Sequence, residues 1–267
     1  MKKITLLLII LIMLITNLIY INNNKNIEVY SNLNEDILEI RESNTSLKIM
    51  TYNIQHGVGM DNRLNLNRIS RVINKGGAGI IGLNEVDKRM PRSLFINQAK
   101  KIAGDLNMTY VFGPTFKLGL SSYGNALLTV YPVLEVDNII LPGNGREPRG
   151  LLKARLLIPG FGEMLVLTTH LSLQEEARRS EINFLLNYLE NLNKAAILLG
   201  DFNTELKDMG NFTALSYQEK TYPANRPGTG IDMIFVNFPA DYELYTIMSD
   251  GSDHLPLFMN IDIRDLI

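Results

Sequence analysis

The sequence predicts an α/β domain in which two packed β-sheets lie between outer helices. Two observations support this fold class. Short apolar segments of β-type composition alternate with amphipathic helical segments along residues 47–263. The second half of the chain also has more consecutive strand segments than a doubly wound parallel sheet would contain. Several of these segments are apolar almost throughout, which is typical of strands that are covered on both faces.

The expected elements follow in chain order. Eight segments have the length and composition of strands, namely 47–54, 79–86, 125–130, 151–158, 163–169, 195–199, 231–236 and 255–263. Three further segments repeat apolar residues every three or four positions, as one face of a helix does. These helical sets are Leu66, Ile69, Val72 and Ile73, then Ala99, Ile102, Ala103 and Leu106, and later Ile182, Leu185, Leu186 and Leu189.

Composition excludes several classes of protein. The 267 residues include 26 Lys and Arg against 28 Asp and Glu, so the net charge of −2 gives no broad basic field for nucleic acid. The chain has no Cys, which excludes disulfides, thiolate metal sites and Cys nucleophiles. Apolar residues at 46% are sufficient for a globular core.

The N-terminus predicts export. Lys2 and Lys3 precede an apolar run from Ile4 to Ile21, and no small-x-small cleavage site follows it. We interpret residues 1–21 as a signal peptide or a signal anchor, because a buried core helix should show a polar face. The lysines place Met1 on the cytoplasmic side, so we expect an extracellular or cell-surface protein, membrane-anchored or secreted. Residues 22–46 are polar and predict a linker, and we expect residues 47–267 to form the folded domain.

Candidate chemical groups lie at the ends of predicted strands. Asp201 and Asn203 follow the apolar strand 195–199, and residues two apart in an extended segment point to the same side. An acid beside an amide suits a water molecule held for attack next to a developing oxyanion. Gly, Asp and Asn also favour turns, so this motif alone leaves a plain turn open.

A second group involves an acid buried early in a strand. Asp232 begins an apolar strand and needs a partner there. The imidazole of His254 is a natural one, and Asp232 would then hold that ring in one tautomer, as the acid of a catalytic triad does. Asp253 stands beside His254, and an exposed loop pair is the simpler alternative for these two residues.

A third group suits a hard cation. Glu85 closes an apolar strand, where a carboxylate is costly unless a cation is present. Mg²⁺ prefers oxygen ligands and often takes only one or two carboxylates. Asn53 ends the first strand and offers a carbonyl oxygen, and His170 ends another. A zinc site is not supported, since the chain has neither an HExxH motif nor Cys.

In chain order these motifs resemble those of the endonuclease/exonuclease/phosphatase superfamily, which includes DNase I-like nucleases, abasic-site endonucleases, inositol-phosphate phosphatases and neutral sphingomyelinases. The matching pieces are TYNIQHG at 51–57, NEV at 84–86, YGNALL at 123–128, TTHL at 168–171, GDFN at 200–203, IDMIF at 231–235 and SDHLP at 252–256. The resemblance implies a four-layer α/β sandwich with two central mixed β-sheets flanked by helices.

The resemblance also implies roles for single residues. The metal ligands would be Glu85 with Asn53 and Asp253. The catalytic residues would be Asp201 for the water, Asn203 and His170 as donors to the phosphate, and His254 paired with Asp232. Asn125 falls on a site-lining position of the family, and Asn84 stands where many members carry Gln. Arg149 is a candidate phosphate contact, with a surface arginine in a Pro/Gly-rich loop as the equal alternative.

We therefore predict an exported Mg²⁺-dependent phosphoesterase, with Mn²⁺ as the alternative metal, that uses in-line attack of an Asp-activated water on a phosphodiester or phosphomonoester. Its substrate would be a lipid, nucleotide, sugar phosphate or nucleic acid, and a secreted or membrane-anchored DNase I-like endonuclease is the alternative. A non-catalytic binding module should have lost one of Glu85, Asp201, Asn203 or His254, and all are present. The chain contains no GxSxG motif, which argues against a serine esterase. The membrane is an expected partner if the N-terminal segment is uncleaved, and no obligate protein partner is evident.

Overall fold

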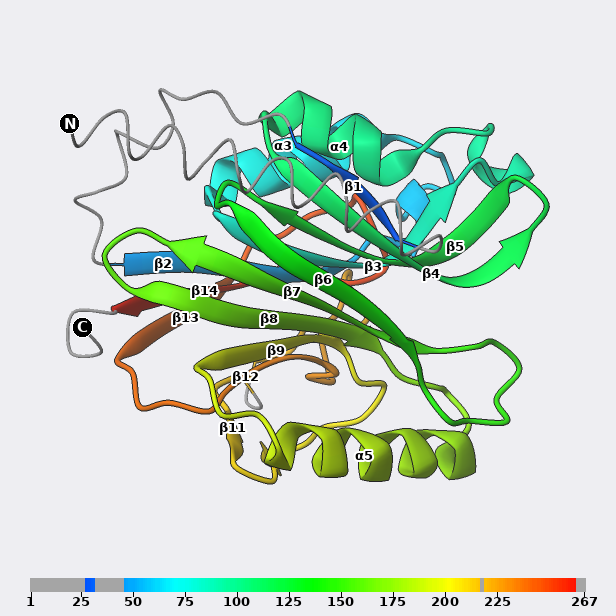
Figure 1. The fold of residues 1–267 in the computed structure, drawn as a ribbon. Helices are drawn as coiled ribbons and strands as arrows, with labels where there is room; N and C mark the ends of the chain where they lie inside the picture. The colour runs from blue at the N-terminus through cyan, green and yellow to red at the C-terminus, as the bar shows by residue number, and fades with distance from the viewer. Residues whose placement is uncertain (1–26, 32–45, 217–218, 263–267) are drawn as a thin grey trace.

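The protein is a four-layer sandwich in which two β-sheets form the middle layers (Figure 1). The computed structural model describes residues 27–31, 46–216 and 219–262. Helices α3 (Leu66–Gly76) and α4 (Gln98–Leu106) cover the outer face of the first sheet, and α5 (Glu175–Glu190) covers the outer face of the second. The predicted fold class is therefore confirmed.

The first sheet has the order β1-β4-β5-β3-β2-β14-β13. Within it only β2 and β3 pair in parallel, and the other pairs are antiparallel. Its strands are β1 (Glu28–Tyr30), β2 (Ser46–Asn53), β3 (Ile80–Lys88), β4 (Thr109–Leu118), β5 (Ser121–Thr129), β13 (Tyr242–Thr246) and β14 (Leu257–Asp262).

The second sheet has the order β10-β11-β12-β9-β8-β7-β6. Strands β8 and β9 form its parallel pair. Its strands are β6 (Val133–Ile140), β7 (Gly150–Ile158), β8 (Gly162–His170), β9 (Ala196–Asp201), β10 (Asp208–Met209), β11 (Phe212–Ala214) and β12 (Asp232–Val236).

The two sheets pack closely at their centre. A Cβ on Gly82 of β3 would lie 1.9 Å from Leu199 Cδ1 of β9, so only glycine fits at this approach. The core between the sheets continues to the inner faces of α3 and α4. A second cluster packs Leu185 and Leu189 of α5 on the outer face of the second sheet. Burial on both faces explains why the central strands have no polar alternation.

Several elements differ from the sequence expectation. Residues 28–30, which we predicted to be linker, form β1 and pair with 110–112 of β4. A three-residue strand with so distant a partner leaves no local pattern. Strands β4, β6, β10, β11 and β13 were also not predicted from the sequence. Strand β4 contains Pro114, which lies at a shift in the register with β5, where the ladder does not need an N–H donor. Strand β6 lies at the edge of its sheet and carries two partly exposed acids, Glu135 and Asp137.

Predictions for the N-terminal segment fall on residues that lie outside the described part of the chain, as do those for most of the linker and for residues 263–267. Within the described ranges, no helix is long and apolar enough to cross a membrane.

The two parallel strand pairs determine where the site lies. Asn53 ends β2 and is paired with Asn84 of β3, while His170 ends β8 and is paired with Asp201 at the end of β9. Asp232, the first residue of β12, pairs with Asp201 from the other side. The polar ends of both sheets therefore meet at one edge of the sandwich.

Candidate active site

A cleft of about 380 Å³ opens at this edge. Its lining includes every predicted site residue except Asn125 and Asp232, namely Asn53, Glu85, Arg149, His170, Asp201, Asn203, Asp253 and His254. Three arginines, Arg92, Arg146 and Arg149, also line the cleft. Four carboxylates, those of Glu85, Glu147, Asp201 and Asp253, line it as well. The structure thus brings the scattered motifs together around one polar cleft with charges of both signs.

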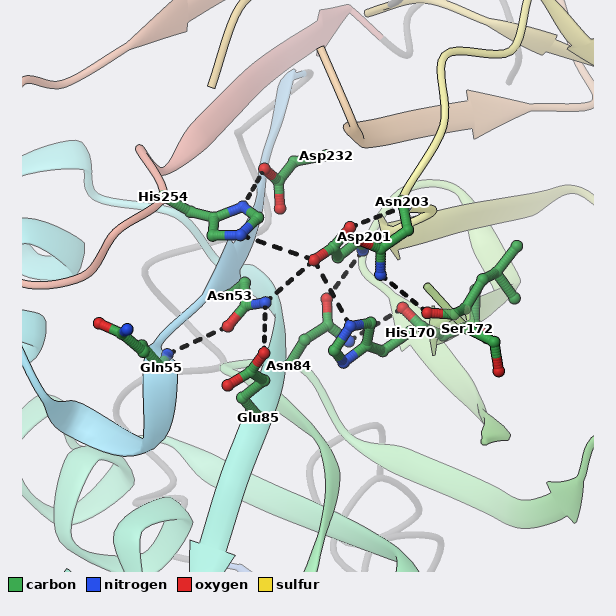
Figure 2. Close-up of polar contacts among 12 residues, drawn as sticks. Asn53, Gln55, Asn84, Glu85, His170, Ser172, Asp201, Asn203, Asp232 and His254 are labelled. Atoms are coloured by element: carbon green, nitrogen blue, oxygen red, sulfur yellow. Dashed lines mark hydrogen bonds and ion pairs between the residues drawn. The ribbon is translucent and has the colours of Figure 1, made fainter. Parts of the chain in front are cut away.

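Asp201 lies at the centre of the polar network (Figure 2). Its side chain is nearly fully buried, and its Oδ2 accepts from Asn53 Nδ2 at 3.0 Å while its Oδ1 accepts from the Asn203 backbone N–H at 2.9 Å. Gly200 precedes it with φ +144°, and a Cβ there would lie 1.9 Å from Thr169 O, so glycine is required. Burial and the charge of Asp232 raise the pKa of Asp201 to about 7.

His254 contacts Asp201 from one side. Its Nδ1 lies 2.7 Å from Asp232 Oδ2, and Thr221 Oγ1 donates to that same oxygen at 2.6 Å. Burial lowers the pKa of His254, but the charges of Asp232 and Asp201 outweigh this and raise it to about 10. The ring is therefore an imidazolium at neutral pH, with Nε2 3.7 Å from Asp201 Oδ2.

His170 contacts Asp201 from the other side, with Nε2 3.5 Å from Oδ2. Its Nδ1 lies 3.0 Å from Arg149 Nη1. Because a guanidinium only donates, Nδ1 must accept, and the ring proton resides on Nε2. Burial and the positive charge of Arg149 lower the pKa of His170 to about 3, so this ring is neutral. Arg149 is only 6% exposed, which rules out the surface-arginine alternative.

Glu85 enters the cleft from an irregular point of β3. Its backbone has φ +57° and lies between Leu83 and Val86, where the pairing with β5 shifts register. A bulge of this kind redirects a side chain. Oε1 accepts from Asn53 Nδ2 at 3.1 Å, and His56 Nδ1 lies 3.6 Å from Oε2. Burial raises the pKa of Glu85, but His56 and Asn53 outweigh it and lower it to about 2.

Two carboxylates of the cleft fit a hard divalent cation. Glu85 is ionised and lines the cleft together with Asp253, and Mg²⁺ binds well to one or two carboxylates plus waters. Asn53, the predicted oxygen ligand, lines the cleft beside them. Its Oδ1 accepts from the Gln55 N–H, and its Nδ2 donates to Glu85 and Asp201.

A second group of potential ligand atoms comes from Asp201, Asp232 and His254, which lie within 4.8 Å of one another. His254 Nδ1 and Thr221 Oγ1 both contact Asp232 Oδ2, whereas Asp232 Oδ1 is buried without a hydrogen-bond partner. An imidazolium at His254 has no lone pair to offer a cation. Glu85 and Asp253, which line the open cleft, remain the candidate cation ligands.

Two buried amides support the cleft from behind. Asn84 Nδ2 donates to Asn125 Oδ1 and to Thr169 O, and its Oδ1 accepts from the Asp201 N–H. Asn125 in turn donates to Gly150 O. These bonds connect β3 and β5 of one sheet with β7, β8 and β9 of the other. Asn125 is thus a support outside the cleft lining, which differs from its predicted role as a substrate contact.

Two residues that contact the His254–Asp232 pair were not predicted from the sequence. Thr221 donates to Asp232, and the Tyr222 ring lies 4.7 Å from the His254 ring and lines the cleft. Both lie in an irregular segment between β11 and β12. Its lack of periodicity left no signal for them.

Comparison with known proteins agrees with this geometry. The model of the Endonuclease/Exonuclease/phosphatase family matches residues 50–254, which include every residue of the site. This chain belongs to that family. Members of the endonuclease/exonuclease/phosphatase family are hydrolases that act on phosphoesters, so the cleft is a phosphoesterase-type site.

Individual relatives are distant. The uncharacterized protein YbhP of Escherichia coli is 25% identical over 246 residues, which cover 82% of this chain and 97% of YbhP. A family member from Beutenbergia cavernae superposes with a TM-score of 0.66 at 21% identity, over 81% of this chain and 71% of that one. A mannosyl-6-phosphatase of Bacteroides thetaiotaomicron has a TM-score of 0.63 at 19% identity, over 80% of this chain and 99% of its own. These two likenesses show the shared fold.

Proposed function

We propose that this protein is an exported, divalent-metal-dependent phosphoesterase that hydrolyses its substrate by direct attack of water. The observation that carries the proposal is Asp201, a buried carboxylate at the base of a polar cleft. Two imidazoles, His170 and His254, both direct Nε2 toward it. The apolar run at residues 4–21 supports export.

Asp201 is the general base of this proposal. Its pKa of about 7 lies near the operating pH, where a carboxylate best combines ionisation with basicity. The Asn203 N–H and Asn53 Nδ2 fix the orientation of the carboxylate. Asp201 would align a water molecule for in-line attack on phosphorus and accept its proton at a carboxylate oxygen.

The developing charge on the phosphoryl oxygens would be met by fixed donors. His254 offers Nε2–H with a positive charge, and His170 offers Nε2–H without one. Their separations from Asp201 Oδ2, 3.7 and 3.5 Å, exceed hydrogen-bond length, so both N–H groups are available to a substrate oxygen. Asn203 Nδ2 donates one hydrogen to Leu171 O, which leaves the second for the phosphate. Donors held in place before reaction are the main source of rate in such sites.

The divalent cation would be held by Glu85 and Asp253. When bound, it would offset the negative charge of the phosphoryl group as a Lewis acid. Mg²⁺ is our first choice because both ligands are carboxylates, and Mn²⁺ is the alternative.

The decisive experiment is hydrolysis of bis(p-nitrophenyl) phosphate by the purified chain, with Mg²⁺ or with EDTA. We expect turnover that EDTA abolishes and that Asp201→Asn lowers strongly. The proposal would be refuted if the parent and Asp201→Asn both hydrolysed the diester only at the uncatalysed rate while their circular dichroism spectra showed that both are folded. A panel of p-nitrophenyl phosphate, plasmid DNA and phospholipid then separates monoesterase, nuclease and lipid activities. Export is tested by accessibility of the domain to protease in intact cells.

A further inference from the structure

Two neighbouring loops beside the cleft expose large apolar side chains. The β3–α4 loop presents Leu94 at 70% and Phe95 at 66% exposure, and the hairpin between β4 and β5 presents Leu118 at 63% and Leu120 at 79%. Phe116 of the same hairpin is also exposed. We call Leu94, Phe95, Phe116, Leu118 and Leu120 the apolar rim. Contiguous exposed apolar groups of this kind mark an interaction surface.

The two loops are joined into one surface. Ser121 Oγ of the hairpin donates to Arg89 O at 2.6 Å, and the Arg89 N–H closes its own loop by donating to Ile96 O at 2.9 Å. Leu118 pairs with Ser121 at the hairpin end. Leu94 and Phe95 of the first loop and Leu118 and Leu120 of the hairpin therefore extend from adjacent backbone segments.

The apolar rim lies at the same edge of the sandwich as the cleft. Strand β4 runs antiparallel to β5, which runs antiparallel to β3, so the ends of β3 and β4 share one edge of the sheet (Figure 1). Glu85 lies near the end of β3, and Arg92 of the 89–96 loop lines the cleft. A surface bound to the rim would thus meet the cleft mouth.

Backbone strain accompanies this exposure. Leu94 and Phe95 are consecutive residues with φ of +56° and +60°, a region that side chains other than glycine and asparagine seldom adopt. Both conformations are held by hydrogen bonds from their N–H groups, to Pro91 O and Met90 O. Strain of this type persists where function retains it.

The charge of the two loops is complementary to an anionic surface. Residues 89–97 and 113–122 contain Arg89, Arg92 and Lys117 and no Asp or Glu. Arg92 forms an ion pair with the buried Asp87 of β3, so the net positive charge of the two loops comes from Arg89 and Lys117. Basic residues beside exposed apolar side chains are typical of segments that lie at the boundary of headgroups and acyl chains.

The path of the N-terminal chain points to the same surface. Glu28 pairs with Phe112 and Tyr30 with Tyr110, so the chain enters β1 from the side of the hairpin. Six residue steps separate Ile21, the end of the apolar run, from Ile27, a reach of at most about 20 Å. Phe112 and Leu118 are also six steps apart in β4, about 20 Å along the strand. A bilayer that holds residues 4–21 is therefore within reach of the apolar rim.

From these observations we infer that the apolar rim inserts into the surface of a lipid bilayer and holds the cleft mouth at the membrane interface. This deepens the proposed function, on whose export step it rests, and it favours a phosphoester that is presented at the lipid surface. The phosphate of such a substrate would meet the cleft from the bilayer side.

Because the chain has no Cys, a fluorophore attached to a single introduced cysteine tests this orientation without labelling any other site. The full-length variants Leu94→Cys and Leu120→Cys would carry a polarity-sensitive fluorophore, with Asn193→Cys as the matched control. Asn193 is exposed and precedes β9, so it lies at the edge opposite the cleft. Each protein is reconstituted into vesicles of phosphatidylethanolamine and phosphatidylglycerol that contain a spin-labelled lipid.

We expect blue-shifted emission and strong quenching at positions 94 and 120, and neither effect at 193. Equal spectra at all three positions would overturn the inference, whether the shared result is quenching or its absence.

A second experiment separates this inference from the proposed catalysis. The variant Leu118→Glu/Leu120→Glu should lose the quenching of a Leu94→Cys label yet hydrolyse soluble bis(p-nitrophenyl) phosphate at the parent rate. Tyr242→Glu changes an exposed residue at the start of β13, which lies beside Ile261 and Leu47 at the edge of the sheet opposite the cleft, and it should alter neither readout. Retained quenching in the Leu118→Glu/Leu120→Glu variant would contradict membrane insertion. Failure of the parent on the soluble diester would count against the proposed function and leave the labelling result unaffected.

Discussion

The two histidines beside Asp201 have the same chemistry and opposite environments. His254 Nδ1 contacts the carboxylate of Asp232, which raises the pKa of the ring to about 10. His170 Nδ1 contacts the guanidinium of Arg149, and burial with this charge lowers its pKa to about 3. One ring is therefore charged and the other neutral over the same pH range.

The group that contacts Nδ1 therefore decides whether each ring is charged, whereas both rings direct Nε2 toward Asp201. Both rings carry a proton on Nε2. In His254 the acid Asp232 accepts from Nδ1, and in His170 the cation Arg149 donates to Nδ1. The Asp232–His254 pair comes from β12 and the segment before β14. The Arg149–His170 pair comes from the residue before β7 and the last residue of β8. A single carboxylate thus faces two N–H donors whose total charge is one, which limits repulsion between them in a buried site.

The largest effect is expected for the group that both rings share. Asp201→Asn keeps the shape of the side chain and removes its basicity, so kcat should fall by about three to four orders of magnitude. Rates on a chromogenic diester at saturating Mg²⁺ measure this. Thermal unfolding is the control, because removal of a buried charge should not lower stability. A decrease below tenfold would exclude Asp201 as the base.

Loss of the charged ring should have the next largest effect. His254→Ala removes a cationic donor and leaves Asp232 without its partner, so we expect a decrease in kcat of about two to three orders of magnitude. His254→Gln retains a donor and separates positioning from charge. Activity of His254→Ala equal to that of the parent would show that His170 alone supplies the donor.

The cation-binding side of the cleft should respond differently. Glu85→Gln removes one of the two carboxylates that we assign to the metal, so the Mg²⁺ concentration for half-maximal activity should rise about 10- to 100-fold. Titration of activity with Mg²⁺ measures this, with Glu147→Gln as the control from the same cleft. An unchanged Mg²⁺ requirement would place the metal elsewhere.

Short-range pattern was sufficient to predict much of this site. The i, i+2 spacing of Asp201 and Asn203 and the polar ends of apolar strands identified the residues that line the cleft. The Asp232–His254 pair followed from the cost of an unpaired buried acid. The two-sheet architecture followed from the run of strands in the second half of the chain.

What sequence could not predict depends on side chains that meet across long loops. Arg149 reaches His170 from a segment rich in Pro and Gly, where no periodicity indicates direction or burial. Asn125 was placed in the cleft by family resemblance alone, whereas its hydrogen bonds to Asn84 and Gly150 hold it behind the lining. Strand β1 depends on a partner about eighty residues away along the chain.

The neutral ring is tested by its own partner. Arg149→Met removes the donor and the positive charge, so the pKa of His170 should rise, although burial, the larger cause, should keep it below the ordinary value of about 6.5. We expect a loss of activity of about tenfold. NMR titration of the His170 ring measures the pKa directly. Arg146→Met, which removes a cation from the same cleft without a contact to His170, is the matched control. A His170 ring that fails to titrate above pH 4 in Arg149→Met would show that burial alone keeps it neutral.

The smallest expected effect concerns stability, and it tests the charged ring. Because the folded-state pKa of His254 is raised to about 10, its pairing with Asp232 stabilises the fold fully below the unfolded pKa of about 6.5, and this is lost as pH rises through 10. Asp232→Asn should therefore lower the free energy of unfolding by about 1–3 kcal/mol near neutral pH, and the difference from the parent should shrink toward pH 10. Denaturant unfolding between about pH 7.5 and 10 measures this in a range where Asp201, with its pKa of about 7, is ionised throughout. A difference that stays constant between pH 7.5 and 10 would mean that His254 is neutral in the folded protein, and the contrast between the two histidines would disappear.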